Sequence, residues 1–229
     1  GLVAWDEFLS FAKKRFGNFI RAWFKLDPEE NMRIGEKSFL RRCPEIGFRG
    51  NAWALWRYID SDRSGIVNMW ELDKNSTVSL AQFWVVVQEK FGGQAERAFA
   101  ALDENHSGWV HKDEFLARMR AMDCAQDLDA PLSQLFDLLD RQGRGSIGLP
   151  DMTYLNRWAP PPYLFTKPDE DGLNSLRDSL YHVYGMPMFR SWRKLFDRDG
   201  NMRVSWEEFS LACKALAERW RRQAPLALG

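Results

Sequence analysis

Five Asp residues recur in equivalent surroundings along the 229-residue chain, and they are the residues best placed to do chemistry. They are Asp27, Asp60, Asp103, Asp140 and Asp197. Each opens a polar stretch whose side chains carry oxygen atoms, and such oxygens suit hard cations like Ca²⁺ and Mg²⁺. Motifs of common catalytic classes, such as a phosphate-binding glycine loop, G-x-S-x-G or H-E-x-x-H, do not occur. We therefore do not expect an enzyme.

The surroundings of each Asp predict a helix, a loop and a second helix. A β-branched residue follows each Asp by seven positions, and a large apolar residue follows it by twelve. An aromatic residue precedes the first four Asp residues by four positions, namely Trp23, Trp56, Phe99 and Phe136. Apolar residues at helical spacing on both sides of the loops predict amphipathic helices, and the four aromatics are expected to anchor them in the core. The predicted fold is all-α, with five helix–loop–helix units.

A longer repeat groups these units in pairs, because an aromatic residue and a glycine precede the first, third and fifth Asp at nearly the same distance. These steps are Phe16-Gly17, Phe91-Gly92 and Tyr184-Gly185. Three consecutive prolines, Pro160 to Pro162, disfavour helix and predict an extended linker. The expected organisation is a first pair over residues 1–78, a second pair over 79–155, a Pro-rich linker over 156–172 and a fifth unit over 173–229, unpaired within the chain.

Composition and charge exclude several functional classes. Lys plus Arg and Asp plus Glu both number 32, so the chain lacks the basic excess expected of a nucleic-acid-binding protein. No apolar run approaches the ~20 residues needed to cross a bilayer, so no transmembrane segment is expected. The 3 cysteines show no C-x-x-C spacing and fit reduced thiols in an intracellular, reducing compartment.

Over most of residues 5–222, this fivefold repeat resembles the EF-hand superfamily, the calmodulin-like calcium-binding proteins. The resemblance implies a twelve-residue loop in which oxygens at positions 1, 3, 5, 7, 9 and 12 surround Ca²⁺. Position 7 contributes its backbone carbonyl, Glu at position 12 binds with two oxygens, and Gly at position 6 permits a sharp turn. The two loops of a pair are also expected to meet in a short antiparallel bridge at the β-branched residue of position 8.

The resemblance implies two or three bound Ca²⁺ ions, with Mg²⁺ as a competitor. Loop two (residues 60–71) is complete, loop three (103–114) has His at position 9, which acts through a water or not at all, and loop five (197–208) has Met202 where Gly is expected. A left-handed residue with a side chain costs about 1–2 kcal/mol, which lowers affinity without abolishing it. The implied ligands are Asp60, Asp62, Ser64, Ile66, Asn68 and Glu71; Asp103, Asn105, Ser107, Trp109, His111 and Glu114; and Asp197, Asp199, Asn201, Arg203, Ser205 and Glu208.

Loops one (residues 27–38) and four (140–151) depart from the pattern. Position 12 of loop one is Ser38, so the bidentate carboxylate is missing. Loop four has Arg144 at position 5, whose guanidinium cannot coordinate Ca²⁺ and is able to occupy the site itself, and the shorter Asp151 at position 12. We expect both loops to be structural partners of loops two and three. Loop five then needs a partner from another chain, from residues beyond 229 or from an unrelated segment.

Five tryptophans that do not precede a loop by four residues are candidates for partner-binding surface, because aromatic residues are enriched at interfaces. They are Trp5, Trp53, Trp84, Trp158 and Trp220. The expected function is a Ca²⁺-responsive regulatory or interaction module for a protein partner. Two alternatives stay open, namely a structural subunit of a larger assembly with permanent or degenerate sites, and a regulatory segment of a longer enzyme.

Overall fold

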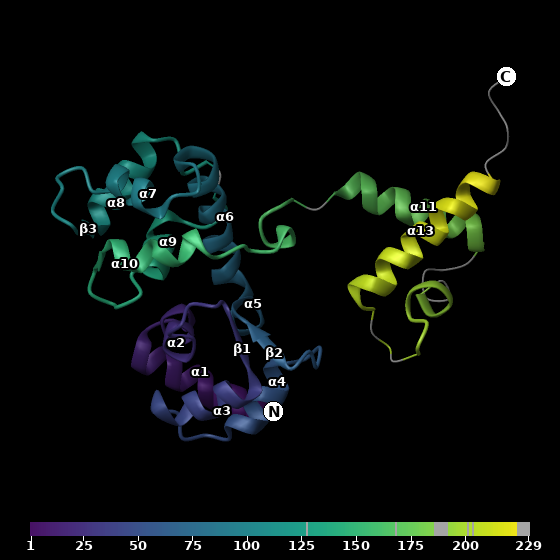
Figure 1. Ribbon diagram of the computed structural model, residues 1–229, viewed down its shortest axis with the longest axis horizontal. Helices are drawn as coiled ribbons and strands as arrows, with labels where there is room; N and C mark the ends of the chain where they lie inside the picture. Colours follow the sequence, from purple (N-terminus) through teal and green to yellow (C-terminus); the bar gives the residue numbers. More distant parts are fainter. Residues whose placement is uncertain (127, 168, 186–191, 201, 203, 224–229) are drawn as a thin grey trace. The chain divides into compact units, whose positions relative to one another are not determined.

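The computed structural model describes residues 1–126, 128–167, 169–185, 192–200, 202 and 204–223. It divides into two units, residues 1–166 and residues 167–229, each with its own hydrophobic core. The described elements are helices apart from four short strands (Figure 1). The predicted all-α class is therefore confirmed.

The first unit contains most of these elements. In chain order they are α1 (Leu2–Phe16), α2 (Phe19–Leu26), β1 (Arg33–Gly35), α3 (Glu36–Glu45), α4 (Ala52–Ile59), β2 (Ile66–Asn68), α5 (Met69–Leu72), α6 (Lys74–Phe91), α7 (Ala95–Leu102), β3 (Val110–His111), α8 (Lys112–Ala121), α9 (Leu132–Leu139), β4 (Ser146–Ile147), α10 (Leu149–Met152), and the 3₁₀ helices η1 (Thr153–Asn156) and η2 (Pro162–Leu164). In Figure 1, α1 to α5 gather at one end of this unit and α7 to α10 at the other, with α6 running between them.

An additional helix precedes each odd-numbered loop unit, and these helices explain the longer repeat in the sequence. Helices α1, α6 and α11 (Glu170–Tyr184) end at the aromatic residue, and the glycine that follows has a positive φ in all three cases. Glycine adopts such a conformation without the steric cost of a Cβ atom. The repeated aromatic–glycine steps are therefore helix ends.

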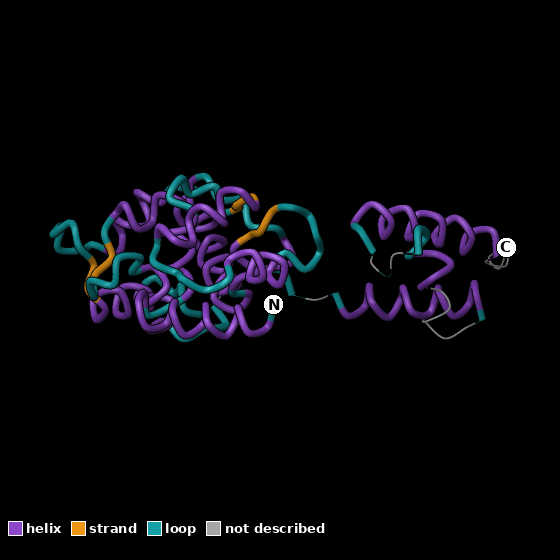
Figure 2. The backbone as a smooth tube through the Cα atoms, turned by 90° about the horizontal axis from the view of Figure 1, so that it is seen from below, coloured by secondary structure: helices purple, strands orange, loops and turns teal. Residues whose placement is uncertain are grey.

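The strands form two short antiparallel ribbons, drawn in orange in Figure 2, and each ribbon joins two loops. Ile34 lies opposite Val67 in the β1–β2 ribbon, and Val110 lies opposite Ile147 in the β3–β4 ribbon. These are the β-branched residues of position 8, and all four are buried. The pairing of loop one with loop two, and of loop three with loop four, follows the register that the repeat predicts.

The helices that lead into loops one to four are anchored by their aromatic residues. Trp23, Trp56, Phe99 and Phe136 are all buried in the core of the first unit, so their predicted role as core anchors is confirmed. Helix α2 begins at an Asn18 cap, whose side-chain oxygen accepts the Arg21 N–H at 2.9 Å. A fixed starting point for α2 positions the first residue of loop one.

The Pro-rich segment packs against the first unit over most of its length. Trp158 and Leu164 are buried, and the ring of Phe165 lies 5.7 Å from that of Trp84 on α6. Tyr163 meets the Trp70 ring of α5 edge-on, with the ring centroids 6.2 Å apart. The boundary between the two units falls after residue 166, within the range expected for the linker.

Within the described residues, the second unit contains α11, a π-helical turn η3 (Trp192–Phe196) and α13 (Trp206–Gln223). Its core includes Leu180 of α11, Leu195 and Phe196 of η3, and Ala212 and Leu216 of α13. Loop five lies between η3 and α13, so this unit again has the order helix, loop, helix.

Two further expectations concern the whole chain. None of the helices in the described ranges combines the length and the apolar character that a membrane span needs. The cysteines form no disulfide within the described residues, and Cys43 and Cys124 are buried.

Candidate functional site

Loop two brings together three carboxylates and a hydroxyl between α4 and α5. Oxygen atoms of Asp60, Asp62 and Glu71 lie within 4.8 Å of one another, and within the described part of the chain this is the one carboxylate cluster of that kind. The Asp60 carboxylate accepts the Gly65 N–H at 3.3 Å, and the Ser64 hydroxyl oxygen also lies 3.3 Å from it. Gly65 has a φ of +76°, which permits the sharp turn. Loop two therefore turns around the Asp60 carboxylate.

Glu71 reaches back from the first turn of α5 and completes this cluster. Its carboxylate accepts the Asn68 N–H at 2.8 Å and the Asn68 side-chain amide at 3.2 Å. Burial raises the pKa of Glu71 above its ordinary value, the Asn68 N–H opposes this shift, and the charges of Asp62 and Asp60 add to it. The cluster therefore carries mutual repulsion that a bound cation would relieve, so the residues present fit a divalent cation with oxygen ligands.

Loop three repeats the hydrogen-bond pattern of loop two between α7 and α8. The buried Asp103 carboxylate accepts the Ser107 N–H at 3.0 Å and the Gly108 N–H at 2.9 Å, and Gly108 has a φ of +80°. Asn105 accepts the same Ser107 N–H at 2.9 Å. The Ser107 hydroxyl donates to the Trp109 carbonyl at 2.7 Å, as Ser64 does to Ile66.

Positions 9 and 12 of loop three, occupied by His111 and Glu114, are less well placed to bind an ion than the equivalent positions of loop two. His111 is exposed and pairs with Ser146 in the β3–β4 ribbon. Glu114 is half-buried and does not join a cluster of three metal-binding groups within the described residues. Loop three therefore offers the expected residues with fewer negative charges gathered around the centre.

Loop five has the expected turn in spite of its missing glycine. Met202 takes a φ of +64°, and its N–H donates to both carboxylate oxygens of the buried Asp197 at 3.2 Å. The Glu208 carboxylate accepts the N–H and the hydroxyl of Ser205, both at 2.9 Å. The hydrogen bonds from Ser205, with the N–H groups of Arg198 and Asp199, lower the pKa of Glu208. Two of the expected ligands, Asn201 and Arg203, lie outside the described residues.

Arginine side chains form ion pairs with the carboxylates of loop four. The Arg144 guanidinium donates to Asp151 at 3.1 Å and lies 4.5 Å from the centroid of the Trp109 ring. Arg21 of α2 donates to the Asp140 carboxylate at 3.2 Å and to its carbonyl oxygen at 2.7 Å. Both aspartates are buried. The residues of loop four therefore do not fit a metal ion, because guanidinium groups already provide the positive charge.

Loop one is joined directly to loop four by charged residues. The Glu30 carboxylate lies 2.6 Å from the Arg141 guanidinium and 2.9 Å from that of Arg157. The Arg141 guanidinium also stacks over Phe24 of α2, 3.6 Å from the ring centroid. Sequence reasoning missed these residues, because Glu30 and Arg141 stand at positions that carry no ligand in the twelve-residue pattern. Only the tertiary contact reveals their pairing.

The five candidate tryptophans separate into two groups. Trp53 is 52% exposed and Trp220 is 38% exposed, as expected of partner-binding residues. Trp158 is 5% exposed, and its assignment to surface is wrong because the Pro-rich segment folds back onto the core. Trp5, stacked on Phe19, and Trp84 are also packed against that core and do not form an open surface.

No protein-family model matches the chain, and no curated protein matches it.

Proposed function

We propose that the chain is a Ca²⁺-binding protein of the EF-hand type that acts as a Ca²⁺-responsive regulatory or interaction module for a protein partner. The observation that carries the proposal is the convergence of the Asp60, Asp62 and Glu71 carboxylates in loop two. The matching hydrogen bonds around Asp103 in loop three and Asp197 in loop five support two further sites.

In loop two the cation would be held by Asp60, Asp62, the Ser64 hydroxyl and both oxygens of Glu71, with the Ile66 carbonyl and Asn68 completing the set. A divalent cation would supply the positive charge that this cluster lacks. Loops three and five would use their equivalent residues, with fewer carboxylates around the centre of loop three. Loops one and four would bind no metal and would support loops two and three through the β ribbons.

A response to the ion would begin at Glu71. Its carboxylate now accepts hydrogen bonds from Asn68, and coordination of a cation would compete with these bonds. Glu71 lies on the four-residue helix α5 next to Trp70, and Trp70 contacts Tyr163 of the Pro-rich segment. A shift of α5 would therefore change the packing of this segment, which leads into the second unit.

A second candidate function is a structural subunit of a larger assembly. It is favoured by the arginine contacts of loop four, which neutralise buried carboxylates without any metal ion. In that case Ca²⁺ would be permanent or dispensable, and the exposed Trp53 and Trp220 would contact neighbouring subunits.

A calorimetric Ca²⁺ titration of the chelator-treated full chain, with Mg²⁺ present and tryptophan fluorescence recorded in parallel, tests the proposal. We expect two or three sites with dissociation constants of roughly 10⁻⁷–10⁻⁵ M and a clear spectral change. Binding without a spectral change, or the absence of any binding heat, would contradict the regulatory proposal and favour the structural subunit.

Single substitutions at position 12 show which loop accounts for each binding step in the Ca²⁺ titration. Glu71→Gln, Glu114→Gln and Glu208→Gln should each remove one site, since an amide cannot bind the ion with two carboxylate oxygens. Glu89→Gln on the exposed side of α6 makes the same chemical change outside any loop and should leave the titration unaltered.

A further inference from the structure

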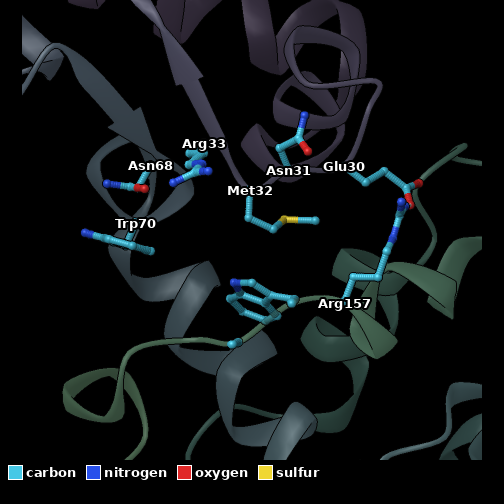
Figure 3. A pocket seen from close by; sticks show the side chains of 9 residues that line it. Glu30, Asn31, Met32, Arg33, Asn68, Trp70 and Arg157 are labelled. Atoms are coloured by element: carbon cyan, nitrogen blue, oxygen red, sulfur yellow. The ribbon is translucent and has the colours of Figure 1, made fainter.

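A pocket of about 320 Å³ lies between loop one, the β2–α5 junction and the segment that follows η1 (Figure 3). Its volume is at the lower end of the roughly 300–1,000 Å³ typical of small-molecule sites. Loop one lacks the carboxylate that a metal ion needs, so the pocket is not itself a calcium site, although Asn68 and Trp70 in its lining also belong to loop two.

Positive charge is in excess around the pocket. Arg33 and Arg157 both line it, and Glu30 is the only acidic residue in its lining. Glu30 is already shared between Arg157, at 2.9 Å, and Arg141, at 2.6 Å. No carboxylate forms an ion pair with Arg33 within the described ranges. Glu30 is thus occupied by Arg157 and Arg141, and Arg33 is the guanidinium at this pocket that can accept an anionic partner.

Amide groups add hydrogen-bonding capacity beside Arg33. Asn31 lines the pocket on loop one, and Asn68 lies directly opposite Arg33 in the β1–β2 ribbon. Asn31 and Arg33 also line a smaller cavity of about 200 Å³ within loop one, together with Ser38 and Arg41. Asp27 and Glu29 also line that smaller cavity, so the excess of donors is confined to the larger pocket, where Arg33, Asn31 and Asn68 suit an oxyanion.

The remaining walls are apolar and aromatic. Met32 points into the middle of the pocket, and Trp70 lies on the side away from Arg157 (Figure 3). Trp158 also lines the pocket and is itself buried. Met32 takes an uncommon φ of +58°, so the loop accepts backbone strain while its thioether lies in the pocket. Thioether and indole groups together suit a flat ring.

We propose that this pocket binds an oxyanion carried on an aromatic ring, such as an aryl phosphate or aryl carboxylate. Arg33 holds the oxyanion by charge-assisted hydrogen bonds, with Asn68 beside it, and Trp70, Trp158 and Met32 enclose the ring, whereas Arg157 lies across the pocket against Glu30 (Figure 3). The ring belongs either to a free small molecule or to a modified side chain of a peptide, since both present the same chemistry to the pocket.

Calorimetric titration of the full chain with phenyl phosphate, in the presence of a calcium chelator, tests this site independently of metal binding. We expect Arg33→Gln to weaken phenyl phosphate binding by roughly tenfold or more, because it removes the charged donor, and Arg157→Gln, across the pocket, to weaken it less. Both side chains are exposed, so the fold should be retained, which circular dichroism can verify. The control Arg49→Gln removes an exposed arginine that does not line the pocket and should leave binding unchanged.

Further probes define the ligand class. Inorganic phosphate should bind more weakly than phenyl phosphate to the unmodified chain, and Trp70→Ala should reduce that difference. A capped phosphotyrosine amide that binds at least tenfold more tightly than phenyl phosphate would assign the ring to a peptide, whereas equal binding would assign it to a small molecule. The proposal is overturned if neither ring compound binds, or if Arg49→Gln weakens binding as much as Arg33→Gln.

Discussion

The Arg141 guanidinium of loop four lies 2.6 Å from the Glu30 carboxylate of loop one, and the two side chains are only 9% and 16% exposed. The same guanidinium covers the ring of Phe24 at 3.6 Å, and the Phe24 ring lies edge-on to Tyr154, 5.0 Å away. This ion pair therefore lies within an aromatic contact that joins the two ends of the first unit.

Replacing Glu30 with Ala should lower the free energy of unfolding by about 3–5 kcal/mol, because it leaves the buried Arg141 without a counter-charge. Urea denaturation followed by circular dichroism measures this loss. Glu29→Ala provides a control on the same loop, since Glu29 is 62% exposed and its pair with Arg42 should contribute less than about 1 kcal/mol. Equal losses in the two variants would show that the Glu30–Arg141 pair does not stabilise the junction.

Loop four should gain a metal site when its arginines are removed. In the triple variant Arg21→Gln, Arg144→Ser, Asp151→Glu, Asp140 is released, position 5 gains a hydroxyl oxygen and position 12 gains a bidentate carboxylate. We expect one more Ca²⁺ per chain in calorimetric titration than in the unmodified protein. Asp151→Glu alone keeps both arginines and should add no site, and an unchanged stoichiometry in the triple variant would contradict this account.

Trp158 and Trp53 should differ sharply in their effect on stability. Trp158→Ala removes a buried indole and should cost about 3–5 kcal/mol, whereas Trp53→Ala, at an exposed position, should change stability by less than about 0.5 kcal/mol. Thermal unfolding of the two variants measures the difference. A small effect at Trp158 would mean that the Pro-rich segment is not packed on the core.

The thiols should differ in reactivity in the folded protein. Burial raises the pKa of Cys43 to about 12, and it also raises the pKa of the less buried Cys213. Because the thiolate is the reactive form, alkylation by iodoacetamide at pH 8 should modify Cys213 before Cys43. Mass spectrometry of the digested protein identifies the modified residue, and faster modification of Cys43 would contradict the burial argument.

The same shift has a consequence for stability. The folded-state pKa of Cys43 lies above the ordinary value of 9.0, so the folded state keeps its proton where the unfolded chain loses it. The free energy of unfolding that this pKa difference contributes is fully present below pH 9 and is lost as the pH rises towards about 12. Cys43→Ser should therefore show a smaller loss of stability between pH 8 and pH 10 than the unmodified chain.

The repeat predicted those features of the fold that depend on neighbouring residues. Trp23, Trp56 and their counterparts are buried where helical spacing places them, and Ile34 pairs with Val67 in the expected register. The Asp60–Glu71 convergence also follows from the spacing of one continuous loop. The buried aromatics and the loop convergence are determined within about twelve residues, and the Ile34–Val67 pairing follows from the repetition of position 8, so a single sequence contains the information.

The contacts between distant segments could not be predicted in this way. Arg21 and Asp140 are separated by more than a hundred residues, and nothing in the composition of either segment indicates their pairing. The burial of Trp158 likewise depends on how the segment after η1 turns back towards α6. The pocket beside Arg33 is formed by three segments that come together only in the folded chain.

The order of the loops in space differs from their order in the chain. Loop two pairs with loop one through β1 and β2, loop one meets loop four through Glu30 and Arg141, and loop four pairs with loop three through β3 and β4. Arginine side chains form ion pairs with Glu30 of loop one and with Asp140 and Asp151 of loop four, so these carboxylates have counter-ions within the protein. If loops two and three bind calcium as proposed, the ion-dependent charges lie at the two ends of this series, and the Glu30–Arg141 ion pair lies between them.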